Sequence, residues 1–365
     1  MPSSPKSDED IFPGSPKGRD DVVLEVRNLR KYFPIQSRSV LFSKVIGQIK
    51  AVDGVDLQIF KGEILGLVGE SGCGKSTLSK TIIGLEKPTT GQVLYFNHDS
   101  DEELLIDVHH PKSKKELMAV RRNIQMVFQD PYNSLNPRRL VKNTLKEPLI
   151  IHKLEKGRED EVVIEMLKKV GLEDYHALRY PHEFSGGQRQ RIGLARALIM
   201  KPELIIADEP VSALDVSVQA SILNLMQDLQ QEFNVSMIFI AHDLSVVKHV
   251  SNRVAVMYLG RIVEIGPTDM VFDRPAHPYT VSLLSAIPFP DPDIKKKRII
   301  LEGDVPSPVN LPKGCRFAPR CYKAQDKCHE EEPLLEEIRP NLWAACHYPE
   351  DEQVIFFDLV EAEQS

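Results

Sequence analysis

Short runs of apolar, mostly β-branched residues recur along this chain between turn-forming residues, and they predict β-strands. The predicted strands lie at 22–26, 64–69, 93–96, 124–129, 204–208, 237–242 and 254–259. Between them, apolar residues recur at the helical spacing i, i+3, i+4, i+7, as in Ile222, Leu225, Met226 and Leu229 and in Val163, Met166, Leu167 and Val170. Strands that alternate with helices predict an α/β fold with a mostly parallel sheet covered by helices.

The same pattern suggests how the chain is divided. Residues 1–20 are rich in Pro, Ser, Gly and charge, which predicts a disordered tail, and 351–365 are expected to form a second tail. One domain is expected over 21–265, with a helix-rich subdomain at about 114–200. From 266 onward, prolines punctuate the chain and periodicity fades, so 266–350 is predicted to be an appended C-terminal domain. No internal repeat is present, which argues against a fused pair of similar domains.

Composition narrows the class of protein. The 365 residues carry a formal net charge of −7, which argues against non-specific nucleic-acid binding as the main role. No run of about 18 or more apolar residues occurs, so we do not expect the chain to span a membrane by itself. The start of the chain lacks the apolar segment of a secretory signal. We therefore expect a cytoplasmic protein.

Residues 69–76 read GESGCGKS, which matches the phosphate-binding pattern G-x-x-x-x-G-K-S. The motif follows a predicted strand and opens a helical pattern, the context that a P-loop requires. Its glycines let backbone N–H groups wrap phosphates, Lys75 supplies a positive charge, and the Ser76 hydroxyl can coordinate Mg²⁺. We assign nucleotide binding to Gly69, Ser71, Gly72, Cys73, Gly74, Lys75, Ser76 and Thr77, with Cys73 at a position that the pattern leaves free.

Two carboxylates follow another apolar run, in LIIADE at 204–209. Asp208 ends a predicted strand at the edge where the P-loop is expected, so it can hold Mg²⁺ directly or through water. Glu209 follows it and can polarise the attacking water as a general base. Without the P-loop upstream, adjacent carboxylates after a strand would be equally consistent with solvated loop charges.

A second potential anion site lies in FSGGQ at 184–188, which opens a segment of strong helix formers. Ser185, Gly186, Gly187 and Gln188 stand at a predicted helix N-terminus, where backbone N–H groups favour negative charge. One nucleotide rarely needs two such sites in one chain. The second site can therefore serve a nucleotide bound by a partner subunit; the alternative is a plain helix cap.

These motifs resemble the Walker A, signature and Walker B motifs of ABC ATPases, in the same order. The resemblance implies further roles: Gln129 as the Q-loop glutamine on Mg²⁺, residues 212–215 as the D-loop, and His242 as the switch histidine on the γ-phosphate. Phe33 stands where the family stacks an aromatic ring on adenine, with Tyr32 as a substitute. One departure is Phe184, where the family usually has Leu; the Ser and Gly residues of the motif are intact.

Three longer segments, at 127–138, 207–220 and 274–288, resemble the oligopeptide/dipeptide importer ATPases. That likeness implies a peripheral subunit on the cytoplasmic face of the membrane. Its implied partners are two permease subunits, a second ATPase chain and, indirectly, an extracytoplasmic binding protein, with ATP and Mg²⁺ as ligands. The alternatives are a non-transport ABC ATPase acting on nucleic acid or the ribosome, and a metal-binding interaction protein with a vestigial nucleotide site. The transported solute is not specified by this sequence.

Four of the five cysteines, Cys315, Cys321, Cys328 and Cys346, fall near the C-terminus. Four thiolates can bind zinc or hold an iron–sulfur cluster, and in a reducing compartment either is favoured over disulfides. Structural zinc sites usually show close cysteine pairs, which are missing here, and the family resemblance implies a [4Fe–4S] cluster. His329 and His347 keep a Cys/His zinc site open, and free thiols are the third alternative. In each case we expect a structural staple rather than a catalytic centre.

Overall fold

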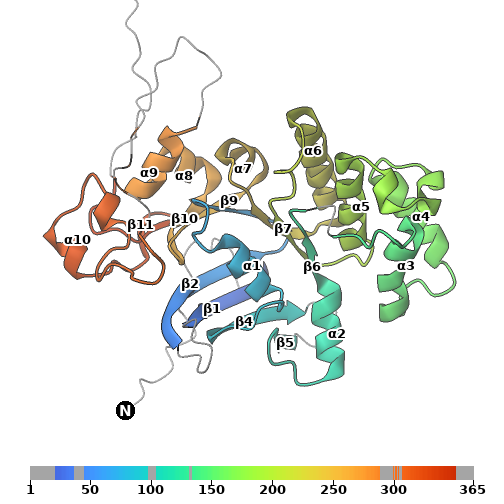
Figure 1. Cartoon of the computed structure of the whole chain (residues 1–365), viewed down its shortest axis with the longest axis horizontal. Helices are drawn as coiled ribbons and strands as arrows, with labels where there is room; N and C mark the ends of the chain where they lie inside the picture. The colour runs from blue at the N-terminus through green and yellow to red at the C-terminus, as the bar shows by residue number, and fades with distance from the viewer. Residues whose placement is uncertain are drawn as a thin grey trace, which may run out of the picture.

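The computed structural model describes residues 21–36, 45–97, 104–130, 134–287, 299, 301, 303 and 306–350. The predicted tails at 1–20 and 351–365 lie outside the described residues, as do Pro288, Pro290 and Pro292 of the proline-rich stretch. Two β-sheets carry the described part of the chain (Figure 1).

The larger sheet has the strand order β11-β12-β10-β9-β3-β8-β7-β6. Its parallel strands are β3 (Ile64–Val68), β6 (Ile124–Val127), β7 (Leu204–Asp208), β8 (Ser236–Ile240) and β9 (Arg253–Tyr258). Antiparallel strands continue it: β10 (Arg261–Pro267), β12 (Leu342–Ala344) and β11 (Glu336–Arg339). The predicted α/β fold with a mostly parallel sheet is confirmed, and the C-terminal region adds two strands to that same sheet.

The smaller sheet is antiparallel and was not expected from the sequence. Its order is β2-β1-β4-β5, formed by β2 (Val45–Phe60), β1 (Val22–Gln36), β4 (Thr90–Asn97) and β5 (Leu104–Asp107). The predicted runs at 22–26 and 93–96 are only the most apolar parts of β1 and β4. Strand β2 has no continuous apolar run, because polar residues such as Asp53 and Gln58 interrupt its buried positions.

Helices flank the larger sheet or extend beyond its ends (Figure 1). They are α1 (Lys75–Ile82), α2 (Lys114–Asn123), α3 (Val141–His152), α4 (Glu159–Lys169), α5 (Gly186–Leu198), α6 (Val216–Phe233), α7 (Leu244–Val250), α8 (Thr268–Asp273), α9 (Pro278–Ser285) and α10 (Asp326–Glu330). The two helices predicted from periodicity correspond to α4 and α6. Helices α3, α4 and α5 gather beyond β6, whereas α10 and β11 lie at the opposite end of the molecule (Figure 1).

Two hydrophobic cores flank the larger sheet. Along β8, Met237 and Phe239 belong to the core shared with the helices, whereas Ile238 and Ile240 belong to the core shared with α1 and the antiparallel sheet. Successive side chains of a strand point to opposite faces, so a strand buried on both faces must be apolar throughout. This explains why the parallel strands stand out in the sequence as uninterrupted apolar runs, and it holds their carboxyl ends rigidly.

Candidate nucleotide-binding site

Neighbouring parallel strands deliver the predicted catalytic residues to one edge of the sheet. The order β3-β8-β7-β6 places four carboxyl ends side by side. The P-loop follows β3, His242 comes two residues after β8, Asp208 ends β7, and Gln129 comes two residues after β6. In open α/β sheets, ligands bind at this edge of the strands. Segments that lie far apart in the chain therefore converge on one site.

The P-loop depends on glycines because other backbone groups approach it closely. Gly69 and Gly74 have φ angles of +150° and +111°. A Cβ atom at either position would lie 2.1 Å from a carbonyl oxygen, that of Met257 or that of Ala51 respectively. No larger residue fits without displacing these strands. The loop leads directly into α1, whose N-terminal N–H groups favour an anion.

Lys75 is folded back over the loop. Its Nζ donates hydrogen bonds to the carbonyl oxygens of Gly69, at 2.6 Å, and Glu70, at 3.1 Å. The lysine is buried, so its charge is held at the point where phosphate oxygens are expected. Cys73 turns its thiol into the protein, and burial raises the pKa of that thiol. Cys73 can therefore take part in phosphate binding through its backbone but not through its sulfur.

Ser76 and Asp208 meet across the sheet edge. The Ser76 hydroxyl donates to Oδ1 of Asp208 at 3.1 Å. Burial raises the pKa of Asp208, the Ser76 hydrogen bond lowers it, and the neighbouring charge of Glu209 raises it. A buried carboxylate beside a second carboxylate is stabilised by a cation. A hydroxyl and a carboxylate oxygen in contact are also the ligand types that Mg²⁺ prefers, so this pair fits the metal.

Glu209 lies next to the two remaining predicted groups. The Gln129 amide donates to Oε2 of Glu209 at 2.8 Å, and Nδ1 of His242 lies 3.8 Å from the same oxygen. Glu209 has a φ of +48°, a left-handed conformation that is uncommon for a residue with a side chain and that accumulates at functional sites. The structure thus brings three of the predicted catalytic residues together, Gln129, Glu209 and His242, at the sheet edge that also carries the P-loop with Lys75.

The two aromatic residues expected near adenine have different surroundings. The Tyr32 hydroxyl bonds to the Asp53 carboxylate, and its ring lines a basic surface pocket with Arg316 and Arg30. Phe33 is half-buried, with Lys31 Nζ 4.7 Å from the ring centroid, and has no comparable polar bond. The Tyr32 hydroxyl is therefore tied to the protein, and Phe33 as the residue that stacks on adenine stays a prediction.

The signature segment lies elsewhere. Ser185 caps α5, accepting from the Gln188 N–H at 3.3 Å while its own N–H donates to the Gln188 side chain at 3.1 Å. Ser185 is exposed, and Gly186 and Gly187 pack against Leu214 and Val218. Figure 1 shows α5 well apart from α1, so one chain does not bring its own signature to its own P-loop.

The C-terminal region holds the P-loop, a contact that the sequence did not reveal. The Tyr279 hydroxyl accepts a hydrogen bond from the Glu70 N–H at 2.8 Å. The Arg320 guanidinium donates to both carboxylate oxygens of Glu70, at 2.8 and 3.0 Å. Tyr279 lies in a segment already singled out by resemblance, which is the signal that could have found it. Arg320 carried no signal beyond its place between two cysteines.

All four C-terminal cysteines line one cavity, together with His277 and His347. Burial raises the pKa of Cys315, Cys321 and Cys346, the last to about 12, and the neighbouring thiols raise the same pKa values further. The cavity is small, about 10 Å³, which is room for one water-sized group. Among the described residues, no three His, Cys, Asp or Glu side chains are grouped closely enough to hold a metal ion. The thiol and imidazole groups are of the types that bind a metal cofactor, but their arrangement in this structure does not form a metal site.

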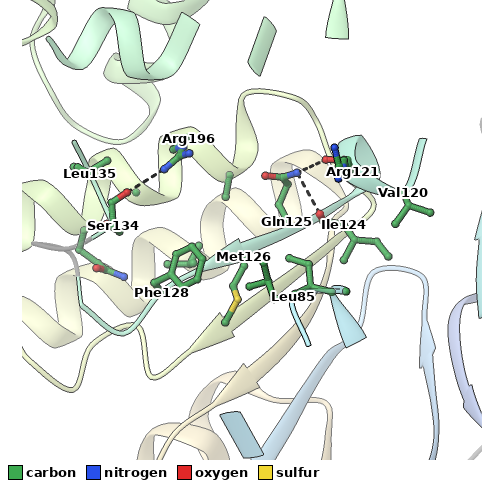
Figure 2. Close-up of a pocket in the computed structure, with 16 residues that line it drawn as sticks. Leu85, Val120, Arg121, Ile124, Gln125, Met126, Phe128, Ser134, Leu135 and Arg196 are labelled. Atoms are coloured by element: carbon green, nitrogen blue, oxygen red, sulfur yellow. Dashed lines mark hydrogen bonds between the residues drawn. The ribbon is translucent and has the colours of Figure 1, made fainter. Parts of the chain in front are cut away.

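A groove lies between α5 on one side and α2, β6 and the segment after α1 on the other. Figure 2 shows its lining, which includes Leu85, Met126, Phe128 and Leu135. Its volume is about 300 Å³. Leu85 and Phe128 are 60% and 40% exposed, although both are large and apolar. Phe128 precedes Gln129, so the groove adjoins the catalytic edge.

The fold and the site together define an ATP-binding cassette. A model of the ABC transporter family matches residues 52–212, and a model of the oligopeptide/dipeptide transporter C-terminal region matches 263–328. The oligopeptide transport ATP-binding protein AppF of Bacillus subtilis is 52% identical over 330 residues, covering 90% of this chain and 97% of that protein. The dipeptide transport ATP-binding protein DppF of Haemophilus influenzae is 49% identical over 328 residues, covering 89% and 96%. The chain therefore belongs to the oligopeptide/dipeptide family of ABC transporter ATP-binding proteins.

Solved structures agree with this assignment. The dimeric ATP-binding cassette MJ0796 in a post-hydrolysis state with ADP and phosphate aligns with a TM-score of 0.55 and 28% identity, over 67% of this chain and 98% of that one. The cassette cbiO1 of Clostridium perfringens also aligns with a TM-score of 0.55, at 29% identity, over 69% and 91%. Within the described ranges, no helix has the length and apolar character needed to cross a membrane.

Proposed function

We propose that this chain is the ATP-hydrolysing subunit of an importer for oligopeptides or dipeptides. The single observation that carries the proposal is the convergence of Lys75, Ser76, Asp208 and the Gln129–Glu209–His242 group at one edge of the sheet. Membership of the oligopeptide/dipeptide family indicates the solute class. We place the chain at the cytoplasmic face of the membrane, bound to its permease.

The residues divide the chemistry among themselves. The P-loop N–H groups and Lys75 hold the β- and γ-phosphates, and Ser76, Asp208 and Gln129 provide the Mg²⁺ ligands. Mg²⁺, when bound, neutralises charge that develops on the phosphate oxygens. Glu209 orients and polarises the attacking water, while His242 contacts the γ-phosphate. Phe33 stacks on adenine.

The signature requires a second cassette. Ser185, Gly186 and Gly187 present an exposed helix N-terminus far from this chain's own P-loop. Two cassettes arranged head to tail bring each signature to the other's γ-phosphate, which makes dimer closure depend on ATP. The MJ0796 cassette is described as dimeric, which supports this arrangement. We propose a distinct ATPase chain as the partner.

The groove in Figure 2 is the surface that we assign to a permease loop. Its exposed apolar residues are rimmed by the positive charge of Arg121 and Arg196, and the buried amide of Gln190 has no hydrogen-bond partner there. A partner segment with an apolar side chain and a polar or acidic end would satisfy all three features. Phe128 lines the groove, and its neighbour Gln129 contacts Glu209. Docking of a permease loop in the groove would therefore affect the Glu209 carboxylate.

For the C-terminal region, we propose a separate role as a stapled domain over 266–350. Four thiols around one cavity provide the donor set of a [4Fe–4S] cluster, which would require these side chains to rearrange; one zinc ion is the alternative. Iron and zinc analysis of anaerobically purified protein distinguishes them. About four irons that are lost in Cys321→Ser, but kept in Cys73→Ser, would support the cluster, and one zinc without iron would refute it.

The function is tested in the transporter assembled with its permease and binding protein. Glu209→Gln should bind ATP normally but hydrolyse it about 10²–10³ times more slowly, the usual scale for losing one catalytic group. Lys75→Ala should instead weaken ATP binding. Glu232→Gln, which removes an exposed carboxylate on α6, is the matched control and should change neither. Undiminished turnover in Glu209→Gln, or ATPase activity indifferent to peptide, would refute the proposal.

A further inference from the structure

Glu70 is fixed in place by two residues from the far end of the chain. It is the second residue of the P-loop, and Arg320 grips its carboxylate with two parallel hydrogen bonds while Tyr279 accepts from its N–H. The Arg320 side chain is 8% exposed and Tyr279 is fully buried. On the other side of the same residue, Lys75 donates to the Glu70 carbonyl. The residue is therefore held at its amide, its carbonyl and its side chain.

The element that carries Arg320 is itself rigid. Arg320 lies in the short loop between Cys315 and Cys321. Phe317 of that loop packs against Tyr258 and Tyr279, with distances between ring centroids of 5.4 and 5.3 Å. Arg316 anchors the same loop by donating to the Leu259 carbonyl and, at 2.6 Å, to the Asp53 carboxylate. A bidentate arginine on such a support fixes both the position and the direction of its partner.

Charge gives the Arg320–Glu70 pair a consequence for nucleotide binding. A carboxylate in a loop that wraps phosphates repels the ligand, unless a positive group neutralises it. Arg320 is that group, because its guanidinium contacts both oxygens of Glu70. Lys75 remains available for the ligand, because its Nζ contacts only carbonyl oxygens and the Cys73 sulfur within the loop.

We propose that Arg320, supported by Tyr279, is a positioning residue that sets the affinity of the P-loop for ATP. Through it, the cysteine-bearing loop acts on the nucleotide site by holding Glu70 and cancelling its charge. This inference rests on the proposed role of the P-loop in ATP binding. It extends that role to a residue about 250 positions away in the chain.

The test measures ATP binding to the purified full chain with a fluorescent ATP analogue. Arg320→Gln should raise the Kd about three- to tenfold, the scale of one uncompensated charge about 10 Å from the ligand in a partly solvated site. The increase should shrink at high salt, because salt screens the repulsion. Arg320→Lys keeps the positive charge but cannot donate two parallel hydrogen bonds to Glu70, so its Kd should lie between those of wild type and Arg320→Gln.

The decisive variant is the double substitution Arg320→Gln with Glu70→Gln. If Arg320 acts by cancelling the Glu70 charge, removing that charge should restore most of the affinity. The matched control is Arg339→Gln, since Arg339 lies in the same C-terminal region but donates to the carbonyls of Arg274 and Glu350, away from the P-loop. An unchanged Kd in Arg320→Gln, or a loss that the double variant does not recover, would overturn the inference. A wild-type chain that binds no ATP would overturn the proposed function instead.

Discussion

Gly187 offers a sharp test of how the signature segment is built. It is the second residue of α5, and a Cβ atom there would lie 2.5 Å from Cγ1 of Val218 on α6. Real Cβ atoms essentially never come closer than 3.0 Å to another heavy atom, so Gly187→Ala forces α5 or Val218 to move. Forced overpacking costs about 1–3 kcal/mol, whereas replacing a helical glycine by alanine gains about 0.5–1 kcal/mol. We therefore expect a net loss of stability of about 1 kcal/mol, within a range of about 0–2.5 kcal/mol.

The functional effect should exceed the loss of stability. Ser185 stands two residues before Gly187, so a movement of the helix start by about 1 Å would displace the group that we propose faces the partner's phosphate. Displacements of that size can cost about 10²-fold in rate. Urea unfolding of the full chain measures the first effect, and ATP turnover of the assembled transporter measures the second.

A control and a rescue separate this clash from a general effect of alanine. Gly193 lies on the same helix, and a Cβ atom there would meet nothing within 4 Å, so Gly193→Ala should stabilise the chain. Adding Val218→Ala to Gly187→Ala removes the clashing atom and should recover most of the turnover. A Gly187→Ala chain that is as stable and active as wild type, or that Val218→Ala does not rescue, would contradict the predicted clash.

Three further predictions follow from the site and its surroundings. Phe33→Ala should raise the Kd for ATP about tenfold through lost stacking, whereas Tyr32→Phe should not; equal effects would contradict the assignment. Leu85→Asp, in the groove, should abolish peptide-stimulated ATPase activity but leave ATP binding by the free chain intact; a weakened binding of ATP would speak against a docking role. Burial raises the pKa of Glu264 from 4.5 to about 7, so only the folded chain keeps this proton between those pH values. The contribution of Glu264 to the free energy of unfolding is therefore fully present below about pH 4.5. As pH rises through 7, the free energy of unfolding of the chain should fall by about 3 kcal/mol relative to that of Glu264→Gln. The measurement is the free energy of unfolding of wild type and of Glu264→Gln as a function of pH, and a difference between them that does not change with pH would refute the prediction. Burial lowers the pKa of His277, which gives an opposite pH dependence of stability in both chains, so this effect cancels in the difference.

Much of the nucleotide site could be predicted from sequence because its motifs are local. The P-loop needs glycines at fixed offsets, a strand before it and a helix after it, and all three are properties of one short segment. Asp208 and His242 follow strands whose continuous apolar character marks them as buried. Parallel strands bring their carboxyl ends to one edge, so the grouping of these residues could be predicted before any coordinates.

The antiparallel sheet and the contacts of the C-terminal region could not be predicted in this way. Strand β2 is half-buried, so polar positions interrupt its pattern, and its partner β1 could be identified only by pairing. The bond between Arg320 and Glu70 joins residues 250 positions apart, and neither residue type is distinctive where it stands.

The sequence by itself predicted the candidate catalytic residues, the α/β class and the parallel strands that carry those residues to one edge of the sheet. Only the tertiary structure decided which end of the chain holds the P-loop, that the four cysteines share a cavity, and that Ser185 lies away from its own P-loop. The physical reason is that hydrogen-bonding and steric requirements act within a few residues and leave a pattern in the sequence. A contact between residues far apart in the chain depends on how the whole chain packs into its two hydrophobic cores, so it cannot be predicted from any single segment of the sequence.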